Sequence, residues 1–220
     1  MKESDFMARE NKKKEIAELN RKLILESAAK LFVEKGYEST TIDDISKDCE
    51  FSRRTIYAYF QSKETIMQHI VLNGLEELKN RIAEILDEIK PFVKRYAAIC
   101  EAMVDYHLKN PNSANQVNAF KPGEMDFETL PDVVKGIFKA GDDINRLLVI
   151  LIEEGKEEGV VRESTESEKS IFIIWSGMTA LIELVNNKGP FISHQFQMTT
   201  EDFLRYGFNQ IINSILEVRI

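Results

Sequence analysis

Arginines, hydroxyls and tyrosines gather in residues 51–63, where three residues are basic and none is acidic. Arginine can donate a bidentate pair of hydrogen bonds to guanine, and hydroxyl groups can bind phosphates or bases. A short helix with Arg53, Arg54 and Thr55 at its N-terminal end would suit the major groove of DNA. We therefore predict a DNA-reading helix over residues 53–61.

Caps and apolar anchors are predicted to position this helix. We expect Ser52 to cap its start, and Ile56 and Phe60, four residues apart, to anchor it in a core. A second short helix before it would begin at Thr41, whose hydroxyl can form a capping box with the acid three residues later. The two helices and the turn between them predict a helix-turn-helix motif over residues 41–60.

A longer helix is predicted upstream, over residues 15–35. Gly36 would end it, because a left-handed C-terminal cap favours glycine. Residues 1–14 lack apolar periodicity, and we expect a mobile basic arm there. Its lysines at 12–14 could reach phosphates or belong to a solvated tail. The predicted buried face of the helix has the three-four spacing of Ile16, Leu19, Leu23, Ile24, Ala28, Leu31 and Phe32.

The remaining sequence predicts further helices, so the expected fold class is all-α. A fourth helix would start at Lys63 and run for about 27 residues, or ~40 Å, linking a head to a body. Residues 112–131 are expected to form a loop with at most one short helix. Other helices are predicted over residues 92–110, 132–158, 166–187 and 200–219.

The last two predicted helices are strongly apolar, and each contains a glycine, Gly177 or Gly207, that would allow close approach. They could pair two subunits through a four-helix bundle, or they could fill the core of a monomer. A helix-turn-helix head normally needs two copies to span adjacent half-sites. We therefore predict a homodimer through the last two helices.

The net charge of −8 is unevenly distributed. Residues 1–75 contain 13 basic and 13 acidic residues, which leaves 16 basic and 24 acidic residues for 76–220. An acidic body with a locally positive tip is compatible with DNA binding without demanding it. The apolar runs are shorter than a membrane span and the N-terminus is charged, so we expect a cytoplasmic protein with no membrane partner.

Residues for catalysis or metal binding are not grouped in the sequence. The three histidines are dispersed, and Cys49 and Cys100 lie far apart, so we predict no metal site. A glycine-rich phosphate loop and a nucleophile elbow are both missing from the sequence. We predict that the protein is not an enzyme and carries no cofactor.

A ligand pocket could form among the body helices, between residues 66 and 185. Its candidate residues combine apolar bulk with a few polar tips. Methionines and aromatic residues at helical spacing are more often plain core, and that alternative stays open. The pocket candidates are Tyr96, Met103, His107, Phe138 and Trp175.

Residues 22–66 resemble the DNA-binding domain of the tetracycline-repressor (TetR) family. The matching segments are ILESAAKLFVEKGYESTT, IDDIS and FSRRTIYAYFQSKETI. The pattern Tyr-x-Tyr-Phe-x-x-Lys, which starts at Tyr57, is the most specific part. The resemblance implies a three-helix DNA-binding head (residues 15–75) and a ligand-binding and dimerisation body (residues 76–220).

The resemblance also implies roles for individual residues. Arg53 and Arg54 would be the candidates for reading bases, and which of them reads is left open. Lys63 would contact the DNA backbone, where helix amides and a cationic side chain can hold a phosphate together. The implied DNA-contacting residues are Thr41, Ser52, Arg53, Arg54, Thr55, Tyr57, Tyr59 and Lys63.

Two residues depart from the family pattern. The family usually has glycine in the turn, where this chain has Glu50. A non-glycine residue in the left-handed conformation costs roughly 1 kcal/mol, so the turn would be strained or differently shaped. Ser46 replaces the usual small alanine-type residue of the second helix.

The predicted function is that of a DNA-binding transcriptional regulator, in this family usually a repressor. It would bind a palindromic operator in double-stranded DNA as a dimer and be released by a small-molecule effector. The alternative is a helical ligand-binding or protein-interaction module with a vestigial head. Glu50 and the acidic total charge favour that alternative slightly.

Overall fold

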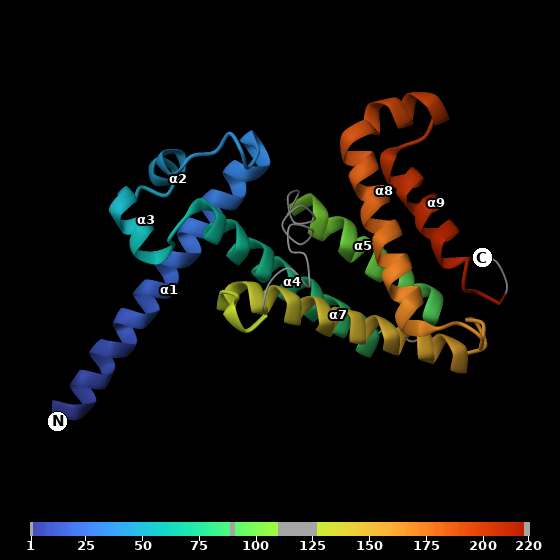
Figure 1. Cartoon of the computed structure of the whole chain (residues 1–220), viewed down its shortest axis with the longest axis horizontal. Helices are drawn as coiled ribbons and strands as arrows, with labels where there is room; N and C mark the ends of the chain where they lie inside the picture. Colours follow the sequence, from blue (N-terminus) through green and yellow to red (C-terminus); the bar gives the residue numbers. More distant parts are fainter. Residues whose placement is uncertain (1, 89–90, 110–126, 218–220) are drawn as a thin grey trace. The chain divides into compact units, whose positions relative to one another are not determined.

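The computed structural model describes residues 2–88, 91–109 and 127–217, and it is helical throughout apart from turns and one isolated bridge (Figure 1). The predicted all-α fold is confirmed. The chain forms two compact units. The first comprises Met1–Asn73 and Asn110–Val134, and the second comprises Gly74–Lys109 and Lys135–Ile220. The predicted domain limits, 15–75 and 76–220, stay predictions.

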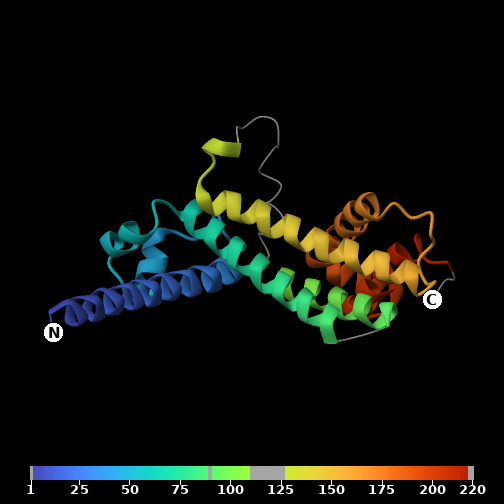
Figure 2. The same ribbon diagram turned by 90° about the horizontal axis from the view of Figure 1, so that it is seen from below.

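The first unit contains α1 (Lys2–Lys35), α2 (Ile42–Asp48), α3 (Arg53–Tyr59) and the first part of α4 (Lys63–Glu88). Helices α2 and α3 lie beside α1 from about its middle to its C-terminal end (Figure 2). Their shared core confirms the predicted anchors, since it includes Ile24, Ala28, Phe32, Ile45, Ile56 and Phe60.

Two predictions for α1 are wrong. The helix begins at Lys2, so residues 2–14 are helical, because this segment is rich in good helix formers and contains no glycine or proline. Ile16, Leu19 and Leu23 were predicted to be buried, yet their exposed fractions are 49%, 56% and 41%. The three-four spacing identified an apolar face, but α2 and α3 cover only part of it.

The second unit contains the rest of α4, together with α5 (Phe92–Lys109), α7 (Asp132–Glu157, from Lys135 on), α8 (Ser167–Phe196) and α9 (Thr200–Ile212). The short helix η1 (Phe127–Thr129) belongs to the first unit, and most of the predicted loop 112–131 lies outside the described residues.

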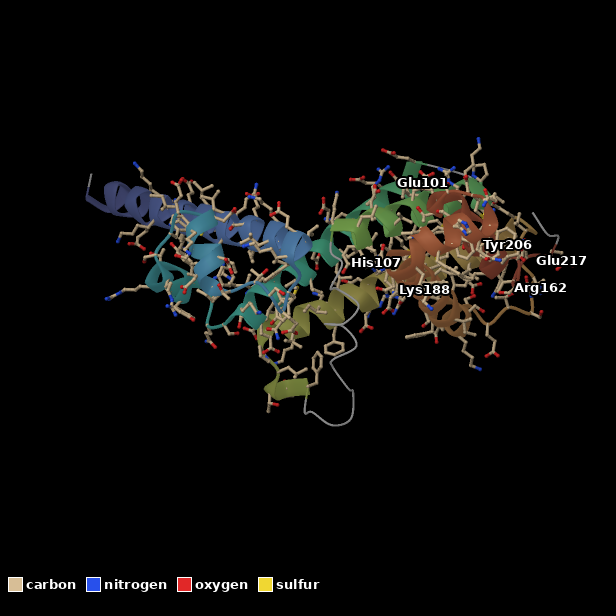
Figure 3. All side chains as sticks on the ribbon, turned by 90° about the horizontal axis from the view of Figure 1, so that it is seen from above. Glu101, His107, Arg162, Lys188, Tyr206 and Glu217 are labelled. Atoms are coloured by element: carbon tan, nitrogen blue, oxygen red, sulfur yellow. The ribbon has the colours of Figure 1, made fainter. Side chains whose placement is uncertain are left out.

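Both terminal helices differ from their predicted limits. Helix α8 does not end at 187 but continues to Phe196 through a kink at Lys188, with Pro190 two residues later. A proline is tolerated there because the first turn after a break needs no amide donor. Helix α9 ends at Ile212, since the chain then turns and pairs Leu216 with Val161. The amides of Arg162 and Glu217, both labelled in Figure 3, donate to the carbonyls of Ile215 and Val160 around this pairing.

The glycines of α8 and α9 allow these two helices to approach each other within one chain. A Cβ atom on Gly207 would lie 2.6 Å from Leu181, and one on Gly177 would lie 3.0 Å from Ile211. From the sequence, we expected this close approach at the contact between subunits. In the structure the close approach occurs between α8 and α9 of one protomer, because Leu181 occupies the space beside Gly207 and Ile211 occupies the space beside Gly177.

Helix α8 is long and apolar enough to cross a membrane by length and composition alone. Its best 18-residue window has a mean hydropathy of 1.2, and 22% of that window is buried. A helix of a soluble protein can meet the same criteria. Because little of this window is buried, α8 exposes an apolar surface that could contact a second subunit.

A charged clamp joins the start of α5 to the end of α7. The guanidinium of Arg95, 5% exposed, donates hydrogen bonds to Glu154 and, at 2.6 Å, to Glu158. Glu158 also accepts the backbone amide of Phe92 at 2.9 Å. Between these groups Gly155 brings α7 against the Phe92 ring, because a Cβ there would lie 2.6 Å from Phe92 and from Val161.

We expect Gly155→Ala to lower the free energy of unfolding by about 1–3 kcal/mol, because the new methyl group overpacks the Phe92 contact. The matched control is Gly141→Ala in the same helix, where nothing lies within 4 Å of the added methyl group. There the higher helix propensity of alanine should stabilise by up to ~1 kcal/mol. Chemical denaturation measures both changes, and equal effects of the two substitutions would contradict the packing argument.

Candidate nucleic-acid interface

Capping interactions fix the starts of both short helices, as predicted. The hydroxyl of Thr41 accepts the amide of Asp44 at 3.2 Å, and the Asp44 carboxylate accepts the Thr41 amide at 2.9 Å. The Thr41 hydroxyl also donates to Asp44, and these bonds with Lys35 nearby lower the pKa of the Asp44 carboxyl far below its usual value. The Ser52 hydroxyl accepts the Thr55 amide at 3.1 Å.

The turn between the helices contains a left-handed residue, so of the two outcomes left open for Glu50 the strained turn is the one observed. Glu50 is exposed with a φ of 57°, a conformation that favours glycine. The hydroxyl of Ser46 donates a 2.6 Å hydrogen bond to the carbonyl of Phe51 and so ties α2 to the turn. The two departures from the family pattern therefore occur at the same turn: Glu50 strains it and Ser46 adds a bond across it.

Of the two arginines at the start of α3, only one is held by a neighbour. The Nε of Arg53 lies 3.0 Å from a carboxylate oxygen of Asp43 on α2. Arg54 is exposed and has no ion pair with any residue that the structure describes. Tyr57, one turn further, is 48% exposed. The outer surface of α3 therefore offers one free guanidinium, one paired guanidinium and a phenol.

Tyr59 points towards α1 rather than away from the head. Its hydroxyl accepts a 3.0 Å hydrogen bond from the side-chain amide of Asn20, and its ring is half-buried. The phenol of Tyr59 therefore lies at the edge of α1. A contact with the wall of a DNA groove, as predicted for Tyr59, would have to be made there. The first contribution of Tyr59 is to join α3 to α1.

Arg21 of α1 holds the end of the reading helix. Its guanidinium donates to the carbonyl of Tyr59 at 3.2 Å and lies 4.7 Å from the centre of the Phe60 ring. The other guanidinium nitrogen lies 3.2 Å from Nε2 of His69 on α4. Arginine can only donate, so this contact requires a neutral histidine with an unprotonated Nε2.

The ammonium of Lys63 is occupied inside the head. It donates to the backbone carbonyls of Tyr37 at 2.8 Å, of Thr40 at 2.9 Å and of Glu38 at 3.4 Å. It also lies 4.3 Å from the centre of the Tyr37 ring. These contacts hold the loop between α1 and Thr41 in place. The contact of Lys63 with the DNA backbone stays a prediction, and the ammonium would have to give up some of these internal contacts to make it.

The predicted pocket residues meet only in part. Tyr96, Met103 and Trp175 line one small cavity of about 20 Å³ in the second unit, which has room for about one water molecule. His107 is buried elsewhere on α5, where desolvation lowers its pKa to about 4, and Phe138 is half-buried on α7. A larger cavity of about 490 Å³ lies between α5 and α9, and only Tyr96 of the predicted residues lines it.

Little in the sequence indicated this larger cavity. Several of its lining residues are charged and exposed, and a charged helix face normally indicates only contact with solvent. Among the described residues, no group of three or more histidines, cysteines and acids could hold a metal ion.

Two capped short helices against a third, with a free arginine at the start of the last, define a helix-turn-helix DNA-binding protein. Residues 24–70 match the family of bacterial regulatory proteins described as the tetR family. This match places residues 24–70 in the DNA-binding domain of the tetR family and agrees with a DNA-binding transcriptional regulator.

Named relatives agree with this assignment. The HTH-type transcriptional regulator YhgD of Bacillus subtilis is 27% identical over 164 residues, which are 74% of this chain and 82% of YhgD. The negative regulator IcaR of Staphylococcus aureus is 39% identical over 59 residues, 27% of this chain and 32% of IcaR. The crystal structure of the TetR-family regulator PfmR from Thermus thermophilus is 26% identical with a TM-score of 0.64, covering 86% of this chain and 96% of PfmR.

We expect Lys63→Met to lower the free energy of unfolding by about 2 kcal/mol, since three carbonyls lose a charged donor. Lys47→Met is the matched control, because it removes one exposed positive charge from the same head. The salt dependence of DNA binding gives a second measurement. If Lys63 makes the predicted phosphate contact, the slope for Lys63→Met should be smaller by about one unit, whereas an unchanged slope would show that its role is confined to the loop carbonyls.

We also expect the stability of the head to depend on His69. Burial, and then the charge of Arg21, lower the pKa of His69 from its usual 6.5. The folded state thus favours the neutral ring, so its contribution is complete above pH 6.5 and is lost as the pH falls through the lowered folded value. Because the ring is only half-buried, screening limits the loss to about 1 kcal/mol or less.

The variant for this test is His69→Gln, which keeps a hydrogen-bond acceptor and does not titrate. Its unfolding free energy should change less than that of the natural chain as the pH falls below about 6.5. His194→Gln, at an exposed position, should leave the pH profile as it is. Identical profiles for the natural chain and His69→Gln would refute the role of His69.

Proposed function

We propose that the protein is a dimeric repressor that binds a palindromic operator and releases it when a small molecule binds the second unit. The observation that carries the proposal is the capped α3 with the unpaired guanidinium of Arg54 at its N-terminal end. Arg54 reads a base, and Arg53, which Asp43 already holds, makes the weaker contribution. Thr41, Ser52, Thr55 and Tyr57 contribute further DNA contacts around it.

Repression is supported by IcaR, whose name describes a negative transcriptional regulator of a biofilm operon. Release by an effector is supported by the cavity in the second unit. Helix α4 would transmit the change, because its residues up to Asn73 belong to the first unit and those from Gly74 belong to the second. The intact caps and buried anchors of the head argue against the alternative of a vestigial DNA-binding module.

Dimerisation through α8 and α9 is supported by their outward faces. Phe172 and Ile173 on α8 are 65% and 68% exposed, and Tyr206 on α9 is 60% exposed. Large apolar patches on a soluble protein commonly mark interfaces. Two copies would place two reading helices one turn of DNA apart, as a palindrome requires. The protein acts in the cytoplasm, without a cofactor and without enzymatic activity.

The test uses the DNA upstream of the gene that encodes this protein, in gel-shift titrations against an unrelated duplex of the same length. Arg54→Ala should reduce the preference for the upstream DNA by about 5- to 150-fold, the value of one bidentate base contact. Arg53→Ala should cost less. Two chains should bind each palindromic duplex.

The matched control is Arg146→Ala on α7, which removes an exposed arginine paired with an aspartate, as Arg53 is paired with Asp43. Its DNA preference should equal that of the natural chain. If the double substitution Arg53→Ala and Arg54→Ala keeps its full preference for the upstream DNA, the proposed reading residues are wrong.

A further inference from the structure

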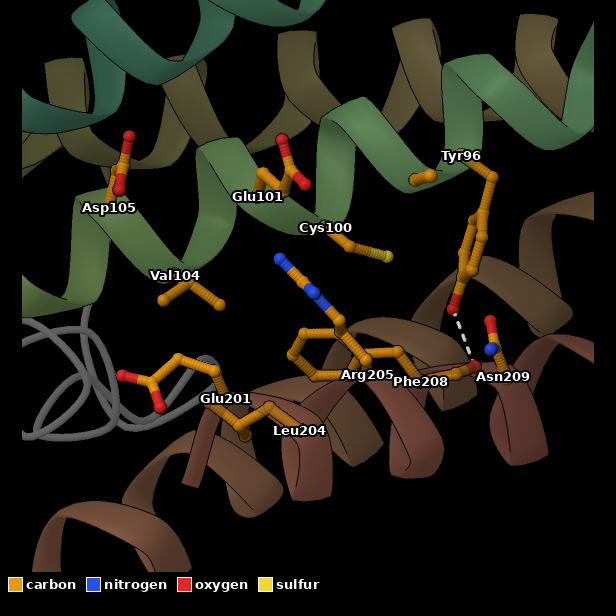
Figure 4. A pocket seen from close by; sticks show the side chains of 11 residues that line it. Tyr96, Cys100, Glu101, Val104, Asp105, Glu201, Leu204, Arg205, Phe208 and Asn209 are labelled. Carbon is orange, nitrogen blue, oxygen red and sulfur yellow. Dashed lines mark hydrogen bonds between the residues drawn. The ribbon is translucent and has the colours of Figure 1, made fainter. Parts of the chain in front are cut away.

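A cavity of about 490 Å³ opens between α5 and α9, with every lining residue in the second unit (Figure 4). This volume lies within the ~300–1,000 Å³ that is typical of sites for small organic ligands. The neighbouring cavity beneath Tyr96 has about 20 Å³ and could not accept such a molecule. Of these two cavities, the space between α5 and α9 is therefore the one whose size suits an organic ligand.

The floor of the groove is apolar and offers no free charge. Leu204 and Phe208 of α9 face Tyr96 and Cys100 of α5 across it. The phenol of Tyr96 donates to the carbonyl of Phe208 at 2.8 Å, so its hydroxyl is already used and its ring is what remains for a ligand. Burial raises the pKa of the Cys100 thiol to about 12, which keeps that group neutral. Such a floor suits an apolar body.

The charges around this floor are mostly negative. Glu101 and Asp105 lie one turn apart on α5, and Glu201 lies on α9. Within the described part of the chain none of the three has a cationic partner within 4 Å, and Glu201 accepts only a hydroxyl. Arg205 is the one basic residue of the lining, so the carboxylates exceed it by two charges. An anion would meet net repulsion here, and a cation would meet net attraction.

Arg205 itself illustrates what the groove accommodates. Its side chain reaches from α9 towards α5, with its aliphatic stem in the groove and its guanidinium near the α5 wall (Figure 4). A flexible, exposed arginine can move aside at little cost. A ligand with a similar distribution of charge, a cationic centre on an apolar body, could take the same space.

We propose that this groove binds amphipathic organic monocations, such as quaternary ammonium or phosphonium compounds with an apolar body, and that these are the effector class of the regulator. The second half of this inference rests on the proposed function. The apolar body covers Leu204 and Phe208, and the cationic centre lies among Glu101, Asp105 and Glu201. The aromatic rings of the floor add attraction to the cation. Ligand between α5 and α9 displaces α9, which also carries the proposed dimer surface.

The test measures binding to the full chain by calorimetry, without DNA. The probes are tetraphenylphosphonium and tetraphenylborate, which share size and shape and differ in the sign of their charge. Tetraphenylphosphonium should bind with one site per chain, and tetraphenylborate should bind at least about tenfold more weakly. Equal binding of the two ions would overturn the charge argument.

The variant Glu101→Gln with Asp105→Asn should weaken tetraphenylphosphonium about tenfold, since each exposed carboxylate contributes a factor of a few. The matched control, Glu157→Gln with Asp142→Asn, removes two exposed charges of α7 that lie outside the groove. Val104→Trp keeps every charge and fills the groove, and it should abolish binding. If the groove variants bind tetraphenylphosphonium as tightly as the control does, the site is wrong.

The effector role is tested separately by adding tetraphenylphosphonium to the complex with the upstream DNA. Release by the natural chain, and none by Val104→Trp, supports the role. Binding without release overturns the effector assignment and leaves the site. A chain that binds the cation but not the DNA refutes the proposed function alone, because calorimetry uses no DNA.

Discussion

Helix α3 has seven residues, and a helix of this length is not stable by itself in water. The surrounding structure must hold it, and both of its ends are held. Ser52 caps the start, Ile56 and Phe60 are buried beneath it, and Arg21 binds the carbonyl at its end. The orientation in which α3 presents its arginines to DNA depends on this cap, these buried anchors and the contact with Arg21 of α1.

Much of the positive charge in the head is used for this internal support. Lys63 binds three carbonyls of the loop before α2, Arg21 binds the end of α3, and Arg53 pairs with Asp43. Counting basic residues in this segment therefore overstates the charge that is free to meet DNA. Arg54 is distinguished from its neighbour by having no such partner among the described residues.

Helix α9 takes part in three regions of the second unit. One of its faces packs on α8, where Gly207 and Gly177 remove the side chains that would hold the helices apart. Another faces α5 across the acidic groove, and a third exposes Tyr206. Because all three regions include the same helix, a movement of α9 at one of them also moves its residues at the other two. Helix α9 can therefore couple the groove to the exposed apolar surface.

Local rules explain which parts could be predicted. Caps and glycine stops depend on neighbouring residues, so the box at Thr41, the cap at Ser52 and the anchors Ile56 and Phe60 follow from spacing alone. The extension of α8 past residue 187 was missed because a proline two residues after a break can begin a new helical turn. The TetR resemblance likewise came from a contiguous motif.

The sequence by itself determined the helical class, the helix-turn-helix motif and the residues at the start of its reading helix, because each depends on short-range spacing. Only the tertiary structure decided that Ile16, Leu19 and Leu23 are exposed, that Lys63 and Arg21 bind carbonyls, and that the larger cavity lies between α5 and α9. Periodicity marks an apolar face without saying which helix covers it. The partner of a charge is likewise set by residues tens of positions away in the chain.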